Sequence, residues 1–278
     1  MHPLMMGSLS WVTYQQRLQE GNAIVLIPCG ALEQHGPHLP LGTDALLSTS
    51  VAQAVAEQIN GLVAPTFSYG YKSQPKSGGG QSFPGTTSLD GSSLIHLMRD
   101  VVRELARQGV TQIGVVNGHY ENQWFLTEGI ELAIREMGND SGLRVMRLEY
   151  WDFLTQDILD KVFPDGFPGF ALEHAAVIET SLMIHYHPNL VHLNLIPDIP
   201  PTDFPPYDLF PQCPEWVHPS GVLSSAKSAS AEKGKLMAEH ITTGIAAAIQ
   251  QAFPPISPSD RSFSIFSHPS QRSSQSTC

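Results

Sequence analysis

The sequence is short of cysteine and of positive charge, and each shortage argues against a class of protein. Only three of the 278 residues are cysteine and no C-x-x-C pair occurs, which argues against a zinc ribbon and against a disulfide framework. Lys and Arg number 15 against 26 Asp and Glu, so the net charge is -11. This balance repels phosphate backbones, and we expect no nucleic-acid partner.

Long apolar runs are also missing. The longest apolar stretch, residues 23–32, is interrupted by Pro28 and Gly30 and is too short to span a bilayer. The first ten residues lack a basic region followed by a long apolar run, so we expect no secretory signal, no membrane partner and a cytoplasmic location. The hydrophobic share of 41% is that of a globular chain with a sizeable core.

Strand-like and helix-like segments alternate along the chain. Short apolar runs predict strands over residues 23–27, 61–67, 111–116 and 144–148, and helical spacing predicts helices over residues 45–59, 92–108, 122–137, 175–186 and 229–250. This order predicts a single α/β domain over residues 1–254, with a mostly parallel sheet flanked by helices on both faces. Residues 197–219 are proline-rich and predict an irregular excursion, and the Ser- and Pro-rich residues 255–278 predict a disordered tail.

Acidic residues and histidines follow two of the predicted strands. Glu33 and His35 are two residues apart in G-A-L-E-Q-H-G-P-H-L-P-L-G-T-D, which ends at Asp44 just before a helix. His119 and Glu121 repeat the spacing in N-G-H-Y-E-N after the third strand. Side chains two apart in extended backbone point the same way, and parallel strands place their ligands at their carboxyl ends.

These five residues predict a site for Zn²⁺ or Mn²⁺, with two ions sharing Asp44 as one arrangement. Each has an ordinary alternative, because a lone Asp before a helix is often an N-cap and a lone His is usually structural. The repeated pairing after two strands favours the metal site. His38 is offset by three residues from His35, which turns it to the other side.

A further pair, Glu173 and His174, precedes Glu179 on a predicted helix. His174 beside a metal-bound water would be a natural proton carrier, because its pKa lies near neutrality. The alternative is a helix-start glutamate beside a solvent-exposed histidine.

The glycine-rich segment K-S-G-G-G, residues 76–80, lacks the G-K-[ST] ending of a phosphate-binding loop. We interpret it as a loop that covers a substrate, and the absence of a G-x-S-x-G elbow around Ser77 argues against a serine hydrolase. Tyr120 and Trp151 are aromatic candidates for a small-ligand pocket, although isolated aromatic residues more often belong to the core.

Several motifs together resemble the creatininase (creatinine amidohydrolase) family from about residue 8 to residue 254. They are G-A-L-E-Q-H-G-P-H-L-P at residues 30–40, Y-G-Y-K-S-Q at 69–74, K-S-G-G-G at 76–80, F-P-G-T-T-S-L at 83–89, N-G-H-Y-E-N at 117–122, Y-W-D-F at 150–153, E-H-A-A-V-I-E-T-S at 173–181, F-P-P-Y-D at 204–208 and L-S-S-A-K at 223–227. So many separate matches make the resemblance highly specific.

The resemblance implies a site with two divalent ions, Zn²⁺ or Mn²⁺. One ion would be held by Glu33, Asp44 and His119, and the other by His35, Asp44 and Glu121. The resemblance further implies that Ser77, Tyr120 and His174 contact the substrate, with Trp151 in the pocket wall. It also implies assembly as a homohexamer.

The implied reaction is the reversible hydrolysis of creatinine to creatine. In that hypothesis His174, helped by Glu121 or Glu173, moves a proton from water to the departing ring nitrogen, and Phe170 caps the substrate. The chain departs from the family at Phe170-Ala171, where the creatinine enzyme has Trp-Asp. The alternatives are therefore a related hydrolase acting on another cyclic or formyl amide, and a non-catalytic metal- or ligand-binding protein.

Overall fold

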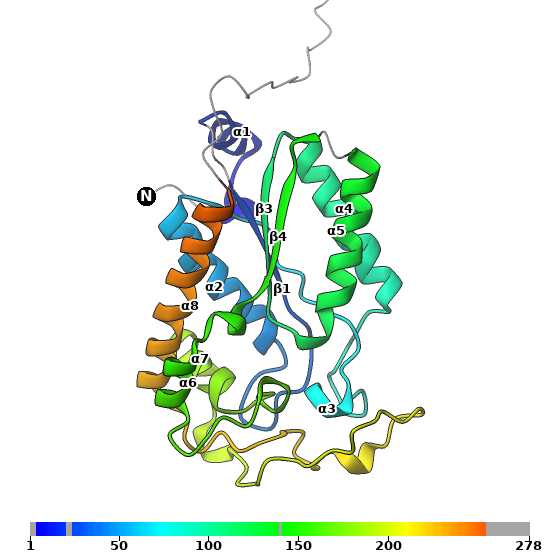
Figure 1. Ribbon diagram of the computed structural model, residues 1–278, viewed down its shortest axis with the longest axis vertical. Coiled ribbons are helices and arrows are strands. Elements are labelled where there is room, and N and C mark those ends of the chain that lie inside the picture. Colours follow the sequence, from blue (N-terminus) through cyan, green and yellow to red (C-terminus); the bar gives the residue numbers. More distant parts are fainter. Residues whose placement is uncertain (1–3, 21–23, 139–140, 254–278) are drawn as a thin grey trace, which may run out of the picture.

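The computed structural model describes residues 4–20, 24–138 and 141–253. A parallel sheet of four strands, in the order β2-β1-β3-β4, runs through its centre (Figure 1). The strands are β1 (Val25–Cys29), β2 (Leu62–Val63), β3 (Gln112–Asn117) and β4 (Arg144–Glu149). The predicted α/β class and parallel sheet are confirmed.

Helices cover both faces of the sheet. On one side lie α2 (Thr43–Ile59), α7 (Val177–Tyr186) and α8 (Ala231–Ala252), and on the other α4 (Gly91–Arg107) and α5 (Gln123–Met137) (Figure 1). Alternate strand residues supply the two cores: Leu26 and Val116 pack toward α2 and α8, and Val25 and Ile113 toward α4 and α5. Burial on both faces explains why β1 is apolar throughout rather than alternating, whereas the edge strand β4 keeps the exposed Arg144 and the half-buried Arg147.

Three short helices arise where the sequence predicts none: α1 (Trp11–Gln19), α3 (Pro75–Gly78) and α6 (Gln156–Val162). The predicted strand over residues 61–67 is wrong in length, because only Leu62 and Val63 pair continuously with β1. Phe67 returns to the sheet through one isolated bridge to Cys29.

The interpretation of residues 76–80 as an irregular loop changes in part, because Ser77 lies in α3. The proline-rich residues 197–219 contain no α-helix or strand, as expected. Ala23 and the predicted tail, residues 255–278, lie outside the described residues. Within the described ranges, every helix is too short or too polar to serve as a membrane-spanning segment.

Two glycines allow the loops after β1 and β3 to lie against the start of α2. A Cβ atom on Gly30 would collide with the backbone of Ala45, and one on Gly118 would lie 2.8 Å from the carbonyl oxygen of Asp44. Any larger residue would push the loops apart. Both loops therefore meet the first turn of α2 at the carboxyl end of the sheet.

Candidate metal centre

Asp44 lies at the centre of the polar cluster where the two loops meet. Helix α2 begins at Thr43 with Gly42 as its N-cap, so Asp44 is inside the first turn and its carboxylate is not the cap. Its side chain is only 2% exposed. The positive end of the helix stabilises a carboxylate at this place, and His35 and His119 outweigh the opposing effect of burial and lower its pKa.

Two asparagines hold the neighbouring loops in register. Asn117 donates from Nδ2 to the carbonyl oxygen of His119 at 2.8 Å, and Asn122 donates from Nδ2 to the carbonyl oxygen of Gly30 at 3.0 Å. The Asn122 bond thus ties the loop that carries His119 to the loop that carries Glu33, and the Asn117 bond holds the His119 loop itself in place.

His119 has one ring nitrogen on the backbone and the other among carboxylates. Its Nε2 lies 3.0 Å from the carbonyl oxygen of Tyr71, which can only accept, so Nε2 carries a proton. Its Nδ1 lies 3.1 Å from Glu33 Oε2 and 3.0 Å from Asp44 Oδ2. We call Glu33, Asp44 and His119 the His119 group.

His35 also has one ring nitrogen on the backbone and the other among carboxylates, but here Nδ1 faces the backbone and Nε2 faces the carboxylates. Its Nδ1 lies 3.0 Å from the carbonyl oxygen of Glu33, and its Nε2 lies 2.9 Å from Asp44 Oδ1 and 3.6 Å from Glu179 Oε2. We call His35, Asp44 and Glu179 the His35 group. Asp44 belongs to both groups and turns one carboxylate oxygen toward each histidine.

This geometry fits a bound cation. In the neutral tautomer fixed by each backbone carbonyl, the second nitrogen presents a lone pair to carboxylate oxygens, which also carry lone pairs. In the described part of the chain, four buried atoms of the cluster have no hydrogen-bond partner: Glu33 Oε1, His35 Nε2, Asp44 Oδ2 and Glu121 Oε2. Imidazole and carboxylate donors in these numbers suit Zn²⁺ or Mn²⁺.

The pKa shifts of His35, His119 and Glu33 also indicate a site that favours positive charge. Burial lowers the pKa of both His35 and His119, but the neighbouring carboxylates outweigh it and raise each pKa well above its usual value. Burial also raises the pKa of Glu33 to about 7. Without a metal, protons occupy the places that a cation would take.

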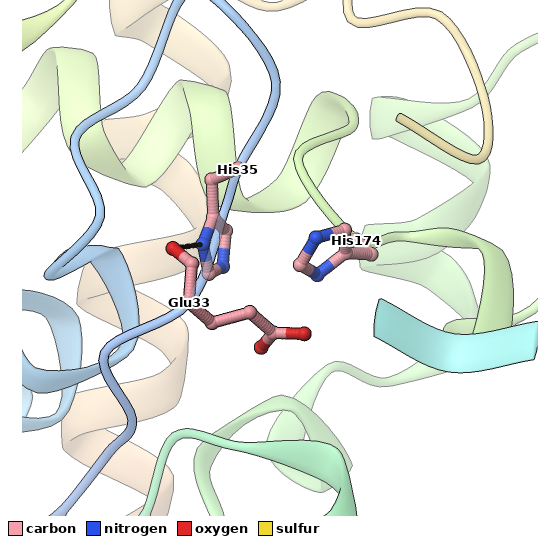
Figure 2. A group of neighbouring side chains, drawn as sticks. All are labelled: Glu33, His35 and His174. Atoms are coloured by element: carbon pink, nitrogen blue, oxygen red, sulfur yellow. Dashed lines mark hydrogen bonds between the residues drawn. The ribbon is translucent and has the colours of Figure 1, made fainter. Parts of the chain in front are cut away.

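Four of the five predicted ligands lie in three overlapping groups of possible metal donors. Within the described ranges, the groups whose donor atoms all lie within 4.8 Å of one another are the His119 group, the His35 group, and a third made of Glu33, His35 and His174. Figure 2 shows this third group, with the Glu33 carboxylate reaching below the two imidazole rings. Glu121 is in none of them, and its role as a ligand stays a prediction.

Glu121 instead contacts Ser77 and the far nitrogen of His119. Its Oε1 accepts from Ser77 Oγ at 2.5 Å and from the backbone N–H of Gln74 at 3.0 Å. Its Oε2 lies 3.4 Å from His119 Nε2. Helix α3 therefore places Ser77 next to the cluster, where the Ser77 hydroxyl group donates a hydrogen bond to the Glu121 carboxylate.

His174 stands beside the His35 group, with the two imidazole centroids 4.3 Å apart. Its Nε2 lies 2.8 Å from the carbonyl oxygen of Gln34 and 2.9 Å from the side-chain nitrogen of the same residue. The two amide hydrogens of Gln34 are directed at the carbonyl oxygens of Gly78 and Gly221, so His174 Nε2 donates to the Gln34 carbonyl and Nδ1 is left as the acceptor. Burial, reinforced by His35, lowers the pKa of His174 well below its usual value. The ring is therefore neutral at pH 7.

Glu173 is buried against the start of α7. Its Oε2 accepts from the backbone N–H of Ile178 at 2.8 Å, and burial raises its pKa to about 8. At neutral pH this carboxyl group carries a proton.

One pocket unites nearly all the predicted site residues. Its lining contains the predicted ligands Glu33, Asp44, His119 and Glu121 together with Ser77, Tyr120, Trp151, Phe170, Glu173 and His174. Tyr120 and Trp151 stack with ring centroids 6.2 Å apart. His35 is not in the lining and joins the site through Asp44 and Glu179.

Sequence reasoning assigned no role to Glu179, which the structure places in this pocket. The available signal was its position in the first turn of the helix that follows His174. That position alone does not show which way the side chain turns.

Comparison with known proteins gives a consistent result. The creatininase family, described as creatinine amidohydrolase, matches residues 7–249. The chain is 49% identical to the creatinine amidohydrolase of Pseudomonas putida over 252 residues, which are 90% of this chain and 97% of that protein. It is 34% identical to a mycofactocin precursor peptide peptidase of Mycolicibacterium smegmatis over 172 residues, 60% of this chain and 59% of that protein.

Solved creatininase structures share the fold. The Mn form superimposes with a TM-score of 0.89 at 48% identity, and a Glu-to-Gln variant complexed with creatine does so with 0.88 at 47% identity. Each comparison covers 91% of this chain and 99% of the other. The Zn-Zn form of a Glu-to-Gln variant gives a TM-score of 0.89 at 48% identity, with the same coverage. By sequence over most of its length, and by fold, this chain belongs to the creatininase family.

Proposed function

We propose that this protein is a creatinine amidohydrolase, which hydrolyses the cyclic amide of creatinine to creatine and catalyses the reverse reaction. The observation that carries the proposal is the Asp44 carboxylate, which faces His35 with one oxygen and His119 with the other inside a pocket that also contains His174. The family relationship to the Pseudomonas putida enzyme supports this choice of substrate.

Two divalent ions, Zn²⁺ or Mn²⁺, are the proposed cofactors. Glu33, Asp44 and His119 would hold one ion, and His35 and Asp44, with Glu121 as predicted from the sequence, would hold the other. Such ions lower the pKa of a water molecule toward neutrality and polarise a carbonyl group. The chain itself must then move the proton and orient the ring.

His174 is the proposed proton carrier. Its depressed pKa keeps the ring neutral, and the contact between Nε2 and the Gln34 carbonyl leaves Nδ1 to accept a proton from water and pass it to the departing ring nitrogen. Glu173, with its pKa raised to about 8, is protonated and suited to donate rather than accept. Glu121 would assist by accepting the hydrogen bond that holds the Ser77 hydroxyl group in position.

Aromatic and hydroxyl groups would bind the substrate. Ser77 and Tyr120 would orient the ring, Trp151 would form one wall beside Tyr120, and Phe170 would cap it. Phe170 is packed edge-on against Phe167 with ring centroids 4.8 Å apart, which steadies it at the pocket.

A related hydrolase acting on another cyclic or formyl amide is the second candidate. Phe170 has no indole N–H, and Ala171 cannot accept a hydrogen bond from a guanidino-type nitrogen. These two residues would weaken creatinine binding while leaving the proposed hydrolytic groups in place.

The proposal extends to assembly and location: a homohexamer in the cytoplasm, with the catalytic domain over residues 1–254. The assembly is proposed from the resemblance to the creatininase family. Light scattering on the purified protein would give the number of subunits.

The deciding experiment is a creatinine hydrolysis assay on metal-stripped protein reloaded with Zn²⁺ or Mn²⁺. Activity that returns with metal supports the proposal. Binding of about two ions per chain without creatinine turnover would overturn the substrate and favour the second candidate. The double variant F170W/A171D would then test whether these two residues set the substrate.

A further inference from the structure

His38 follows His35 on the loop after β1 but belongs to none of the metal-donor groups found among the described residues. Its side chain is fully buried. Burial lowers its pKa to about 4, against a hydrogen bond with the Ala175 backbone that raises it, so the ring is neutral at pH 7. Its Nδ1 is buried without a hydrogen-bond partner in the described part of the chain. Such a ring destabilises the fold unless its other nitrogen makes a useful contact.

The contact of His38 Nε2 leads to the turn beside His174. Nε2 lies 3.0 Å from Thr180 Oγ1, and the Thr180 hydroxyl group donates to the carbonyl oxygen of Ala175 at 3.4 Å. A carbonyl oxygen can only accept, so the hydroxyl hydrogen points to Ala175 and His38 Nε2–H donates to Oγ1. A single chain of hydrogen bonds therefore runs from His38 through Thr180 to the residue that follows His174.

Ala175 is a place where the backbone needs such support. Its φ of 54° lies in the left-handed region, which alanine rarely adopts. It precedes Ala176, the N-cap of α7, so its carbonyl oxygen lies outside the hydrogen-bond ladder of the helix. Because Ala175 is fully buried, a side chain must supply the partner of this carbonyl oxygen. An unfavourable φ persists only where the surrounding contacts fix it.

The turn at Ala175 sets the direction of the His174 side chain. Helix α7 is packed against α2 and α8, so a change of φ at Ala175 would move His174 rather than the helix. The backbone N–H of Ala175 donates to Glu179 Oε2 at 2.5 Å, and His174 Nε2 lies 2.8 Å from the Gln34 carbonyl oxygen. If the turn relaxed to a negative φ, His174 would leave the Gln34 carbonyl and Nδ1 would point elsewhere.

From these contacts we propose that His38 and Thr180 are positioning residues, which hold the left-handed turn at Ala175 and so keep His174 in place beside the metal centre. The effect on turnover rests on the proposed role of His174 as proton carrier, whereas the effect on the turn does not. The ordinary alternative is that both side chains only fill the core between the loop after β1 and α7.

Substitutions at Thr180 separate these two roles. Thr180→Val keeps nearly the same shape but loses the hydroxyl group, whereas Thr180→Ser keeps the hydroxyl group and loses a methyl group. A residue that only fills the core should suffer more from serine, and a positioning residue should suffer more from valine. Thr242→Val is the matched control, because Thr242 is also buried and donates to the carbonyl oxygen of Ala238 at 2.8 Å, but lies on α8 outside the pocket lining.

The first test is the crystal structure of each metal-free variant. In Thr180→Val we expect Ala175 to leave the left-handed region and His174 Nε2 to lie more than about 3.5 Å from the Gln34 carbonyl oxygen. Thr180→Ser and Thr242→Val should keep both features. A Thr180→Val structure with the turn and the contact unchanged would overturn the proposal. This measurement uses no creatinine, so failure of the proposed substrate would not be confused with failure of the positioning role.

The second test is kinetic and uses the protein loaded with Zn²⁺. Thr180→Val should lower kcat for creatinine by about 10- to 100-fold, because a small displacement of a proton carrier is costly, while KM and the metal content stay close to those of wild type. Thr180→Ser should recover most of kcat, and Thr242→Val should match wild type. A change confined to KM, or equal losses of kcat in the two Thr180 variants, would contradict a positioning role.

His38 supplies a second pair of variants if Thr180→Val does not fold. His38→Gln brings an amide N–H that can still donate to Thr180, whereas His38→Leu has no donor. We expect His38→Leu to release the turn and lower kcat, and His38→Gln to keep both. The double variant H38L/T180V should lose no more kcat than either single variant, because both substitutions break the same hydrogen-bond chain. Losses that multiply would show two independent effects and would overturn the shared chain.

Discussion

The His119 group and the His35 group use the same kinds of side chain but differ in how tightly they are built. In the His119 group, Glu33, Asp44 and His119 are each at most 3% exposed, and His119 Nδ1 lies within 3.1 Å of both carboxylates. In the His35 group the two corresponding distances are 2.9 and 3.6 Å, and the outer ligand candidate, Glu179, is 14% exposed.

The difference follows from where the residues come from. In the His119 group, Glu33 and His119 lie on the loops after the adjacent strands β1 and β3, which the Asn122 hydrogen bond to Gly30 ties together, and Asp44 lies in the first turn of α2. The His35 group depends on how α7 packs against α2 and α8. We therefore expect the His119 group to bind its ion more tightly and the His35 group to exchange its ion more readily.

The largest effect should come from the residue that both groups share. Asp44→Ala removes one donor from each group, so both ions should bind more than about 100-fold more weakly and creatinine turnover should be lost. The exposed Asp90, which pairs with Lys72, provides the control Asp90→Asn. Metal analysis that finds wild-type content in Asp44→Ala would remove Asp44 from the centre.

The variant His174→Ala tests whether the histidine beside the His35 group acts in proton transfer or in metal binding. It stands against His35, yet its proposed task is to move a proton. His174→Ala should keep both ions while turnover falls by about 100-fold or more. The exposed His96 on α4 supplies the control His96→Ala. Loss of an ion in His174→Ala would instead show that the third donor group, with Glu33 and His35, binds metal.

Metal affinity should depend on pH through both histidines. Because the pKa of His35 and of His119 is raised well above 6.5 in the metal-free protein, each must release a proton when an ion binds. The apparent binding constant of each group should rise by up to about tenfold per pH unit until the raised pKa is passed. Calorimetry in buffers of different ionisation enthalpy would count the protons.

The same shift affects the stability of the metal-free fold. A pKa raised in the folded state stabilises it fully below the unfolded value of about 6.5, and this contribution is lost as the pH rises through the folded pKa. Metal-free protein should therefore melt at lower temperature as the pH rises above neutrality, and metal should abolish much of that loss. A melting temperature independent of pH without metal would contradict the raised values.

The smallest effect should come from Ser77, which meets the centre through Glu121. Ser77→Ala removes a hydrogen bond of 2.5 Å to the Glu121 carboxylate. We expect kcat/KM to fall by about tenfold, or roughly 1.4 kcal/mol, with the metal content unchanged. Ser82→Ala, at an exposed position of the same segment, is the control. An unaltered kcat/KM would exclude Ser77 from substrate binding.

The more tightly built group is also the one that the sequence predicts best. Glu33, Asp44 and His119 follow or precede regular elements whose hydrophobic pattern is clear, and parallel strands bring such residues to one edge. The same alternation of apolar segments predicts the sheet and its covering helices.

What the sequence does not predict depends on packing between distant segments. Glu179 reaches the centre because α7 lies against α2, and no local pattern fixes that contact. Glu121 turns toward Ser77 because α3 is placed beside it, and α3 is too short for a helical period to reveal. The strand expected over residues 61–67 is short for a similar reason, since its pairing ends where β1 supplies no further continuous partner.

Creatinine turnover measured against added equivalents of Zn²⁺ tests the central claim most directly. If both groups must be filled, metal-stripped protein should show little activity at the first equivalent, while the His119 group fills, and should reach its plateau at about two equivalents per chain. Full activity at one equivalent would contradict the need for the His35 group. No activity at any ratio, with both ions bound, would contradict creatinine as the substrate.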